Sequence, residues 1–216
     1  MQSVAAERLK GRAGVRVERG FREEDRDQVA RMFWEAFSGK LGRILGPQDL
    51  ALRFLHGAVR PSHALTVLDE DGTLLGVAGY KTQRGGFVAA TYGDLARVYG
   101  AIGAVWRGVL LDLTDRPMAE GQFLMDGIFV ASDARGRGVG TTLIEAIMQE
   151  AARQGMQTVR LDVIDRNPRA RALYERLGFI PTGKVRTRPF GRIFGFREAT
   201  TMTCPVPPRP RSVKRP

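Results

Sequence analysis

A glycine-rich stretch is the part of this sequence best suited to bind a ligand. It reads Ala134-Arg135-Gly136-Arg137-Gly138-Val139-Gly140-Thr141-Thr142 and joins a predicted strand to a predicted helix. Glycines allow positive φ and let backbone N–H groups converge, and the positive end of the following helix favours anions. The stretch therefore predicts an anion-binding cradle, although a tight strand-to-helix turn without a ligand would have the same pattern.

Two common nucleotide-binding loops do not fit this stretch. The Gly-Lys-Ser/Thr tripeptide of a P-loop does not occur in the sequence. The dinucleotide fingerprint is excluded as well, because Thr141 stands where its third glycine would be. Neither motif therefore identifies the anion that the cradle would bind.

Asp126 is a second candidate for a chemical role. Its segment is 122–130, QFLMDGIFV, a predicted strand. The two-residue period of a strand would place Leu124, Asp126, Ile128 and Val130 on one face. A carboxylate on an otherwise apolar face is a candidate general base, with Glu120 in reserve. A carboxylate bonded to a neighbouring loop or to an arginine explains Asp126 about equally well.

The elements that must position these residues follow from hydrophobic periodicity and turn signals. Strands are expected at 15–20, 64–68, 73–80, 122–130 and 157–164, with a final pair around Pro189-Phe190-Gly191. Helices are expected over 22–38, from Gly46-Pro47 onward, over 92–112, over 139–154, and from Asn167-Pro168 to Gly178. This order is typical of an α/β protein with a mixed sheet.

Composition limits the function classes. The chain has 216 residues, 43% of them apolar, which suits one domain with a sizeable core. One cysteine and two histidines exclude a disulfide framework and a His–Cys metal cluster. No apolar run is long enough for a membrane span, and we expect no secretory signal. The net charge of +11 fits a polyanionic partner or simply solubility, and part of it lies in the terminal segments.

Two blocks make the sequence resemble the GNAT superfamily of acyl-CoA-dependent N-acetyltransferases. In the first block, Arg135, Gly138 and Gly140 match the family's Arg/Gln-x-x-Gly-x-Gly/Ala signature, after a strand ending in Ile128-Phe129-Val130. The second block comprises Leu161-Asp162-Val163, Asn167, Ala170, Ala172-Leu173-Tyr174 and Leu177-Gly178-Phe179. The close match covers about residues 122–181, whereas the first 80 residues agree in element order only.

The resemblance implies a GNAT-like α/β fold. Its mixed, mostly antiparallel sheet would have about seven strands, splayed at the centre and flanked by helices. A helix would be inserted between the third and fourth strands, at 82–121, where the family's connection is usually short. The acetyltransferase domain would span 15–204, between a flexible N-terminus at 1–14 and a basic, Pro-rich, disordered tail at 205–216.

The resemblance also implies a site for acetyl-CoA as co-substrate, without a metal. The backbone amides of residues 136–141 would hold the pyrophosphate, and the strand edge at 128–130 would pair with the pantetheine amides. The implied cofactor-binding residues are Ile128, Phe129, Val130, Arg135, Gly136, Arg137, Gly138, Val139, Gly140, Thr141 and Asn167. For Asn167, a role as a helix N-cap is equally well supported and compatible.

The implied reaction is direct attack of an amine on the thioester in a ternary complex. Asp126 would remove the proton of the ammonium, directly or through water. Tyr174 would protonate the leaving thiolate, although it could also be an ordinary core residue. Nothing in the sequence selects the acceptor, because the 82–121 insertion lies beside the expected acceptor side.

Three functions from different classes remain open at this point. The favoured one is an N-acetyltransferase acting on a small-molecule or peptide amine, in the cytoplasm, with no membrane association and with a homodimer left open. The second is a non-catalytic acyl-CoA-binding or sensing module. A nucleic-acid-binding protein ranks last, because basic residues are not interleaved with aromatic ones and no helix-turn-helix signature occurs.

Overall fold

Eight strands form one sheet in the computed structural model, which describes residues 14–112, 118–186, 196 and 198–207. The strands are β1 (Val15–Arg19), β2 (Ala64–Asp69), β3 (Leu74–Thr82), β4 (Gly85–Gly86), β5 (Gln122–Val130), β6 (Thr158–Ile164), β7 (Ile180–Arg186) and β8 (Glu198–Pro205). Their order is β1-β2-β3-β5-β6-β8-β7, with the short β4 beside β3. Within the described residues only β5 and β6 pair in parallel, so the mixed, mostly antiparallel sheet is confirmed.

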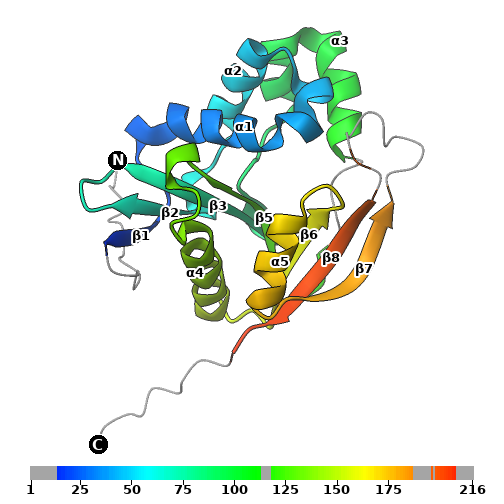
Figure 1. Cartoon of the computed structure of the whole chain (residues 1–216). Coiled ribbons are helices and arrows are strands. Elements are labelled where there is room, and N and C mark those ends of the chain that lie inside the picture. The colour runs from blue at the N-terminus through cyan, green and yellow to red at the C-terminus, as the bar shows by residue number, and fades with distance from the viewer. Residues whose placement is uncertain (1–13, 113–117, 187–195, 197, 208–216) are drawn as a thin grey trace, which may run out of the picture.

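Helices cover both faces of this sheet (Figure 1). The α-helices of the described residues are α1 (Arg26–Leu45), α2 (Gln48–Ala58), α3 (Tyr92–Asp112), α4 (Val139–Arg153) and α5 (Pro168–Arg176). Figure 1 shows α1, α2 and α3 gathered together, away from α4 and α5. The predicted helix between the third and fourth strands of the main path is thus confirmed as α3.

Two buried clusters lie on the two faces of the sheet. One joins α1, α2 and α3 to the sheet through side chains such as Phe33, Phe54 and Leu95. The other joins α4 and α5 to the opposite face through Leu143 and Tyr174 among others. The helices therefore form two separate layers, and a ligand between strands would have a different layer on each side.

Helix α1 is longer than its hydrophobic pattern predicts. It runs to Leu45 rather than to residue 38, although Gly39 and Gly42 lie in the extension. Each glycine costs a helix about 1 kcal/mol relative to alanine. Ile44 and Leu45 are almost fully buried in the first cluster, and burial of such side chains stabilises by about 1.5–3 kcal/mol each. Tertiary packing therefore outweighs the local preference.

Helix α3 has the predicted bounds but is broken at Gly100, where φ is 71° and ψ is 167°. Before the break, Leu95 is buried. After it, Ile102, Val105 and Val109 are 86%, 54% and 56% exposed. The apolar residues of α3 recur at helical spacing, but the break changes the rotational phase of the helix, so only part of this apolar stripe meets the core.

Some predictions lie outside the described residues. These are the flexible segment 1–14 apart from Gly14, the turn at Pro189-Phe190-Gly191, and the tail beyond Pro207. The two strands that flank the turn, β7 and β8, pair antiparallel as expected. Among the helices that the structure describes, none combines the length and the apolar character needed to cross a bilayer.

Candidate active site

The glycine-rich stretch forms a corner between β5 and α4. Gly136 and Gly138 adopt φ of 79° and 84°, and Gly138 is the residue before the first turn of α4. Two amides of the corner are used internally: Arg137 donates to the Ala134 carbonyl at 3.4 Å, and Thr142 donates to the Gly138 carbonyl at 3.1 Å.

The other amides of the corner have no acceptor within the described part of the chain. These are the N–H groups of Gly136, Gly138, Val139, Gly140 and Thr141. Three of them open the first turn of α4, where no intrahelical partner exists. Five free amides within six residues at a helix start are a suitable cradle for a phosphate oxygen.

The space around the corner also suits a ligand. A Cβ built on Gly136 would meet no atom within 4 Å, so this glycine borders open space. A Cβ on Gly140 would meet Leu173 Cδ2 of α5 at 3.5 Å. The side chains of Arg135 and Arg137 are exposed at the same corner, and Nε of Arg135 donates to the Val130 carbonyl at 3.4 Å.

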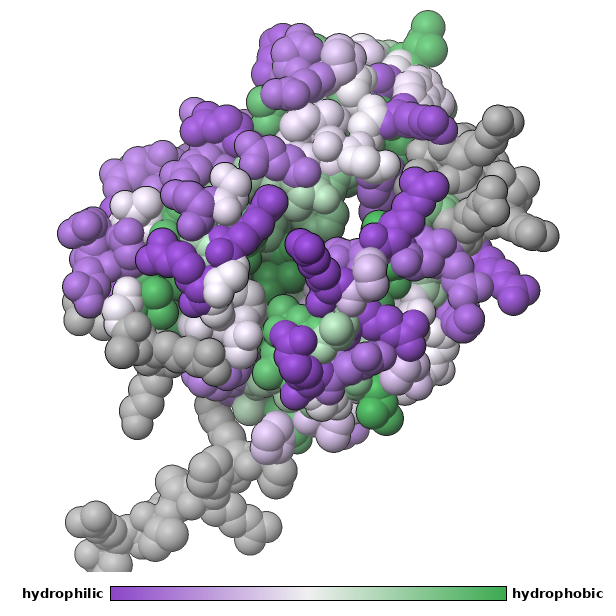
Figure 2. Space-filling model, in the orientation of Figure 1, coloured by the Kyte–Doolittle hydropathy of each residue, from purple (hydrophilic) through white to green (hydrophobic). Residues whose placement is uncertain are grey.

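A cleft opens in the sheet beside this corner. The parallel pairing of β5 and β6 involves only Gln122, Phe123 and Leu124 of β5. Beyond Leu124 the two strands diverge, so the predicted splay at the centre of the sheet is confirmed. Figure 2 shows the surface hollowed between α4 and α5, with a hydrophobic floor and hydrophilic residues on the rim.

A bulge in β5 corrects the predicted face of Asp126. Gly127 pairs with Gly79 of β3, but Met125 pairs with Tyr80, so Asp126 is one extra residue of β5 within the register of the two strands. The bulge shifts the alternation by one residue. As a result Ile128 and Val130 share the second cluster with Met125, and Leu124 does not belong to it. The prediction of one face for Leu124, Asp126, Ile128 and Val130 is therefore wrong.

The register also tells which backbone groups of β5 face the cleft. Ala131 donates its N–H to the Leu75 carbonyl of β3, and Phe129 is paired with Val77 of the same strand. Since successive residues of a strand direct their N–H and C=O to opposite sides, those of Ile128 and Val130 point away from β3. Phe129 directs its ring into the first cluster. Ile128 and the N–H of Val130 therefore offer a strand edge, while the Val130 carbonyl accepts the hydrogen bond from Arg135.

Tyr174 lies on α5 and is 6% exposed. Desolvation by burial raises the pKa of its phenol to about 12. Its ring packs at 6.0 Å from that of Phe179, and its hydroxyl has no hydrogen-bond partner among the described residues. Tyr174 thus belongs to the core, and its protonated hydroxyl makes no hydrogen bond within the part of the chain that the structure describes.

Asn167 is the N-cap of α5. Its Oδ1 accepts a hydrogen bond from the Ala170 amide at 3.1 Å, and Pro168 follows at the first helical position. The predicted capping role is therefore confirmed, and the side-chain amide group of this exposed residue remains free for a second contact. Across the described ranges, no group of three or more His, Cys, Asp or Glu side chains is arranged to hold a metal ion.

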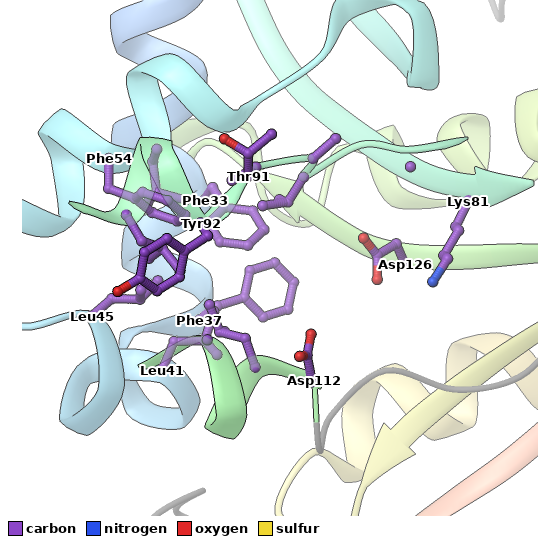
Figure 3. A pocket seen from close by; sticks show the side chains of 18 of the residues that line it. Phe33, Phe37, Leu41, Leu45, Phe54, Lys81, Thr91, Tyr92, Asp112 and Asp126 are labelled. Atoms are coloured by element: carbon purple, nitrogen blue, oxygen red, sulfur yellow. The ribbon is translucent and has the colours of Figure 1, made fainter. Parts of the chain in front are cut away.

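Asp126 lies at one end of a pocket of about 590 Å³. The pocket is formed by α1, α2, α3 and the adjoining strands, on the face of the sheet opposite α4. Figure 3 shows the Asp126 carboxylate beside Lys81, while Phe33 and Phe37 lie toward the interior. Asp126 is thus exposed on a strand bulge between this pocket and the cleft. Glu120 lies in the turn before β5 and does not line the pocket.

The sequence analysis missed most of this pocket. Phe33 and Phe37 recur at helical spacing in α1, and this pattern predicts an amphipathic helix rather than a pocket wall. Lys81 and Asp112 gave no signal, since neither belongs to a motif. Only the position of the 82–121 insertion, beside the expected acceptor side, pointed to this region.

Comparison with known proteins agrees with this geometry. The family model described as the acetyltransferase (GNAT) family matches residues 26–179. N-acetyltransferase 8F1 of Rattus norvegicus is 30% identical over 148 residues, which are 68% of this chain and 63% of the relative. The probable N-acetyltransferase family 8 member 5 of Mus musculus is 30% identical over 62% of this chain and 56% of its own length. The chain therefore spans less than two thirds of these relatives.

Solved structures agree at the level of the fold. A GCN5-related N-acetyltransferase from Kribbella flavida superposes with a TM-score of 0.58 at 22% identity, over 89% of this chain and 98% of that one. An N-acetyltransferase from Staphylococcus aureus Mu50 reaches 0.59 at 15% identity, over 87% and 99%. With a family match that extends from α1 through α5, we conclude that this chain belongs to the acetyltransferase (GNAT) family.

Proposed function

We propose that this protein transfers an acetyl or other short acyl group from acyl-CoA to a primary amine, by direct attack in a ternary complex. The observation that carries the proposal is the set of five free amides at the corner, those of Gly136, Gly138, Val139, Gly140 and Thr141. Two further features support it: the edge of β5 at Ile128 and Val130, and the hydroxyl of Tyr174 in the cluster that packs against these two residues. GNAT enzymes use acetyl-CoA as co-substrate.

The chemistry of these groups fits acyl-CoA. A diphosphate needs several convergent donors, which the corner provides through its backbone and through Arg135 and Arg137. An extended chain with amide groups can add to a free strand edge, which Ile128 and Val130 provide. Acyl-CoA would supply the thioester carbonyl. Side chains and backbone groups of this chain would remove the proton of the amine, stabilise the oxyanion and protonate the leaving thiolate.

Asp126 is the proposed base. An alkyl ammonium has a pKa near 10.4, so nearly all of it is protonated at pH 7 and cannot attack. The Asp126 carboxylate, between pocket and cleft, would accept that proton directly or through a water molecule. A backbone N–H of β5 on the side away from β3, such as that of Ile128, would stabilise negative charge on the carbonyl oxygen.

Tyr174 is the proposed acid. Because its pKa is raised to about 12, the hydroxyl keeps its proton over the whole physiological range. The leaving thiolate, with a solution pKa near 8.5, would take this proton. Holding both substrates in one cleft would contribute to the rate besides the proton transfers.

The first experiment measures acetyl-CoA binding by calorimetry and free-thiol release with a panel of primary amines. We expect binding, and thiol release that depends on the amine. Binding without amine-dependent thiol release would instead indicate the sensing module. Absence of binding would overturn both functions.

A matched pair of variants tests the corner itself. Gly136 and Gly155 lie just beyond the two ends of α4, both have positive φ, and a Cβ on either meets no atom within 4 Å. Gly136→Trp and Gly155→Trp therefore introduce similar backbone strain and similar bulk. We expect Gly136→Trp to weaken acetyl-CoA binding at least a hundredfold and Gly155→Trp to leave it within threefold. Equal affinities in the two variants would refute the cradle.

A further inference from the structure

The pocket beside Asp126 has an apolar interior that the transfer reaction alone does not require. It extends from the sheet between α1, α2 and α3, and its inner wall includes Phe33, Phe37, Leu41 and Phe54 (Figure 3). With a volume of about 590 Å³, it is large enough for a ring or a chain of several carbons rather than for an amino group alone.

The apolar wall is continuous with the strand that carries Asp126. A Cβ built on Gly127 would lie 2.6 Å from Cζ of Phe37, so only glycine lets this ring pack against β5. Phe37 in turn lies 4.7 Å from Phe33 and 6.2 Å from Phe129, measured between ring centroids. An acceptor whose amine meets Asp126 would therefore place the rest of its body against this aromatic cluster.

The charged side chains that line the pocket, within the described part of the chain, are balanced rather than acidic. Two carboxylates, Asp112 and Asp126, line it together with two lysines, Lys40 and Lys81. The Lys40 ammonium also lies 5.5 Å from the ring centroid of Phe196. A site for a polyamine or an aminoglycoside would need an excess of negative charge to hold several ammonium groups. Among the described residues that line this pocket, the two carboxylates are matched by the two lysines, so no such excess is present.

From this arrangement we infer that the acceptor is a primary amine with a single positive charge at the reacting end and an apolar body of about the size of one aromatic ring. The inference rests on the proposed transfer at the same site. The amine would lie at Asp126 and the body would lie in the pocket. Apolar contact would select the acceptor, since each buried methylene is expected to raise kcat/KM about fourfold.

The test compares kcat/KM for thiol release with ethylamine, butylamine, 2-phenylethylamine and spermidine, at saturating acetyl-CoA. We expect the value to rise from ethylamine to butylamine, to be at least tenfold higher for 2-phenylethylamine than for ethylamine, and to be lowest for spermidine. A preference for spermidine, or no dependence on the apolar body, would overturn the acceptor class while leaving the transfer reaction intact. Absence of thiol release with every amine would overturn the transfer reaction instead.

A second matched pair of glycine variants links the preference to this pocket. Gly108 lines the pocket from α3, and a Cβ there would meet Leu95 Cδ1 at an ordinary 3.9 Å. Gly57 lies on α2 outside the lining, with nothing within 4 Å of its Cβ position. Leucine at either position is a better helix former than glycine, so both variants are expected to fold.

We expect Gly108→Leu to lower kcat/KM for 2-phenylethylamine at least tenfold and that for ethylamine less than twofold. Gly57→Leu should change neither value by more than twofold. Calorimetry of 2-phenylethylamine binding in the presence of coenzyme A gives a readout independent of turnover, and should show the same loss for Gly108→Leu alone. Equal losses for both amines, or no loss, would contradict the assignment of the pocket, and melting temperatures identify any variant that does not fold.

Discussion

The two halves of the site are built from different kinds of group. The proposed cofactor half, which comprises the corner at 136–141, the β5 edge and Tyr174, consists mainly of backbone N–H and C=O groups. The proposed acceptor half, which is the pocket under α1, α2 and α3, consists mainly of side chains. The first half needs a defined backbone path, and the second needs a surface of a given shape and polarity. Such a division suits a site in which backbone groups bind the cofactor and side chains select the acceptor.

Asp126 lies where the two halves meet, so its substitution should have the largest effect on turnover. We expect Asp126→Asn to lower kcat/KM for the best amine by about 10²-fold, because general base catalysis contributes at least that much. Acetyl-CoA affinity should stay within twofold, since the side chain points toward the pocket (Figure 3). Steady-state kinetics and calorimetry measure the two quantities separately.

Asp112→Asn is the control for this substitution, because Asp112 lines the same pocket from the end of α3. A loss caused only by reduced negative charge would be similar in both variants. A larger loss for Asp112→Asn than for Asp126→Asn would move the base to Asp112 and would place the boundary between the halves elsewhere.

Substitution of Tyr174 tests the side-chain contribution to the cofactor half. We expect Tyr174→Phe to lower kcat about tenfold with unchanged acetyl-CoA affinity. The pKa of the phenol is raised to about 12 by burial, so the hydroxyl is protonated at every pH from 6 to 9. The factor lost should therefore be constant across this range, which a pH profile of kcat for both proteins measures.

Tyr80→Phe is the matched control for Tyr174→Phe. Burial raises the pKa of Tyr80 to about 12 as well, but its hydroxyl donates to the Ser62 carbonyl at 3.0 Å. Its loss should cost about 1 kcal/mol of stability and leave kcat unchanged. If Tyr174→Phe also retained full kcat, Tyr174 would be a core residue only and the cofactor half would act through backbone groups alone.

The difference between the halves also explains which of them sequence reasoning could predict. The corner depends on glycines at fixed spacing within one continuous segment, so Arg135, Gly138 and Gly140 were sufficient to locate it. The pocket is assembled from positions as distant as Phe33 and Asp126. Its aromatic residues have the same helical spacing as core residues, because a pocket wall on a helix and a core stripe on a helix are the same pattern.

Two features of the fold that the sequence did not predict have a related cause. The bulge at Asp126 is set by the pairing of β5 with β3, where Gly79 and Gly127 face each other. Alternation within β5 alone cannot show that an extra residue interrupts the ladder. The break at Gly100 in α3 is similar, because a glycine within a periodic helix is compatible with continuation and with a break.

The smallest effect on catalysis is expected from Glu150, which lies at the end of α4 far from the corner. Its side chain is fully buried and accepts hydrogen bonds from Arg19 of β1 at 2.8 Å and from Gln154 at 2.7 Å. Burial alone would raise the pKa of Glu150, but the hydrogen bonds from Arg153, Gln154 and Arg19 outweigh it and hold the pKa at about 2. Glu150 thus fixes the helix whose other end carries the free amides.

We expect Glu150→Gln to lower the free energy of unfolding at pH 7 by roughly 2–3 kcal/mol, with acetyl-CoA affinity and acceptor preference unchanged. Because the folded pKa lies below the ordinary value of 4.5, the contribution is complete above pH 4.5 and is lost as the pH falls toward 2. The difference in urea midpoint between wild type and variant should therefore shrink from pH 7 to pH 3. Glu175→Gln, which removes an exposed pair with Arg171, should cost less than about 0.5 kcal/mol at either pH. A changed acceptor preference in Glu150→Gln would show that the two halves are coupled through α4 rather than independent.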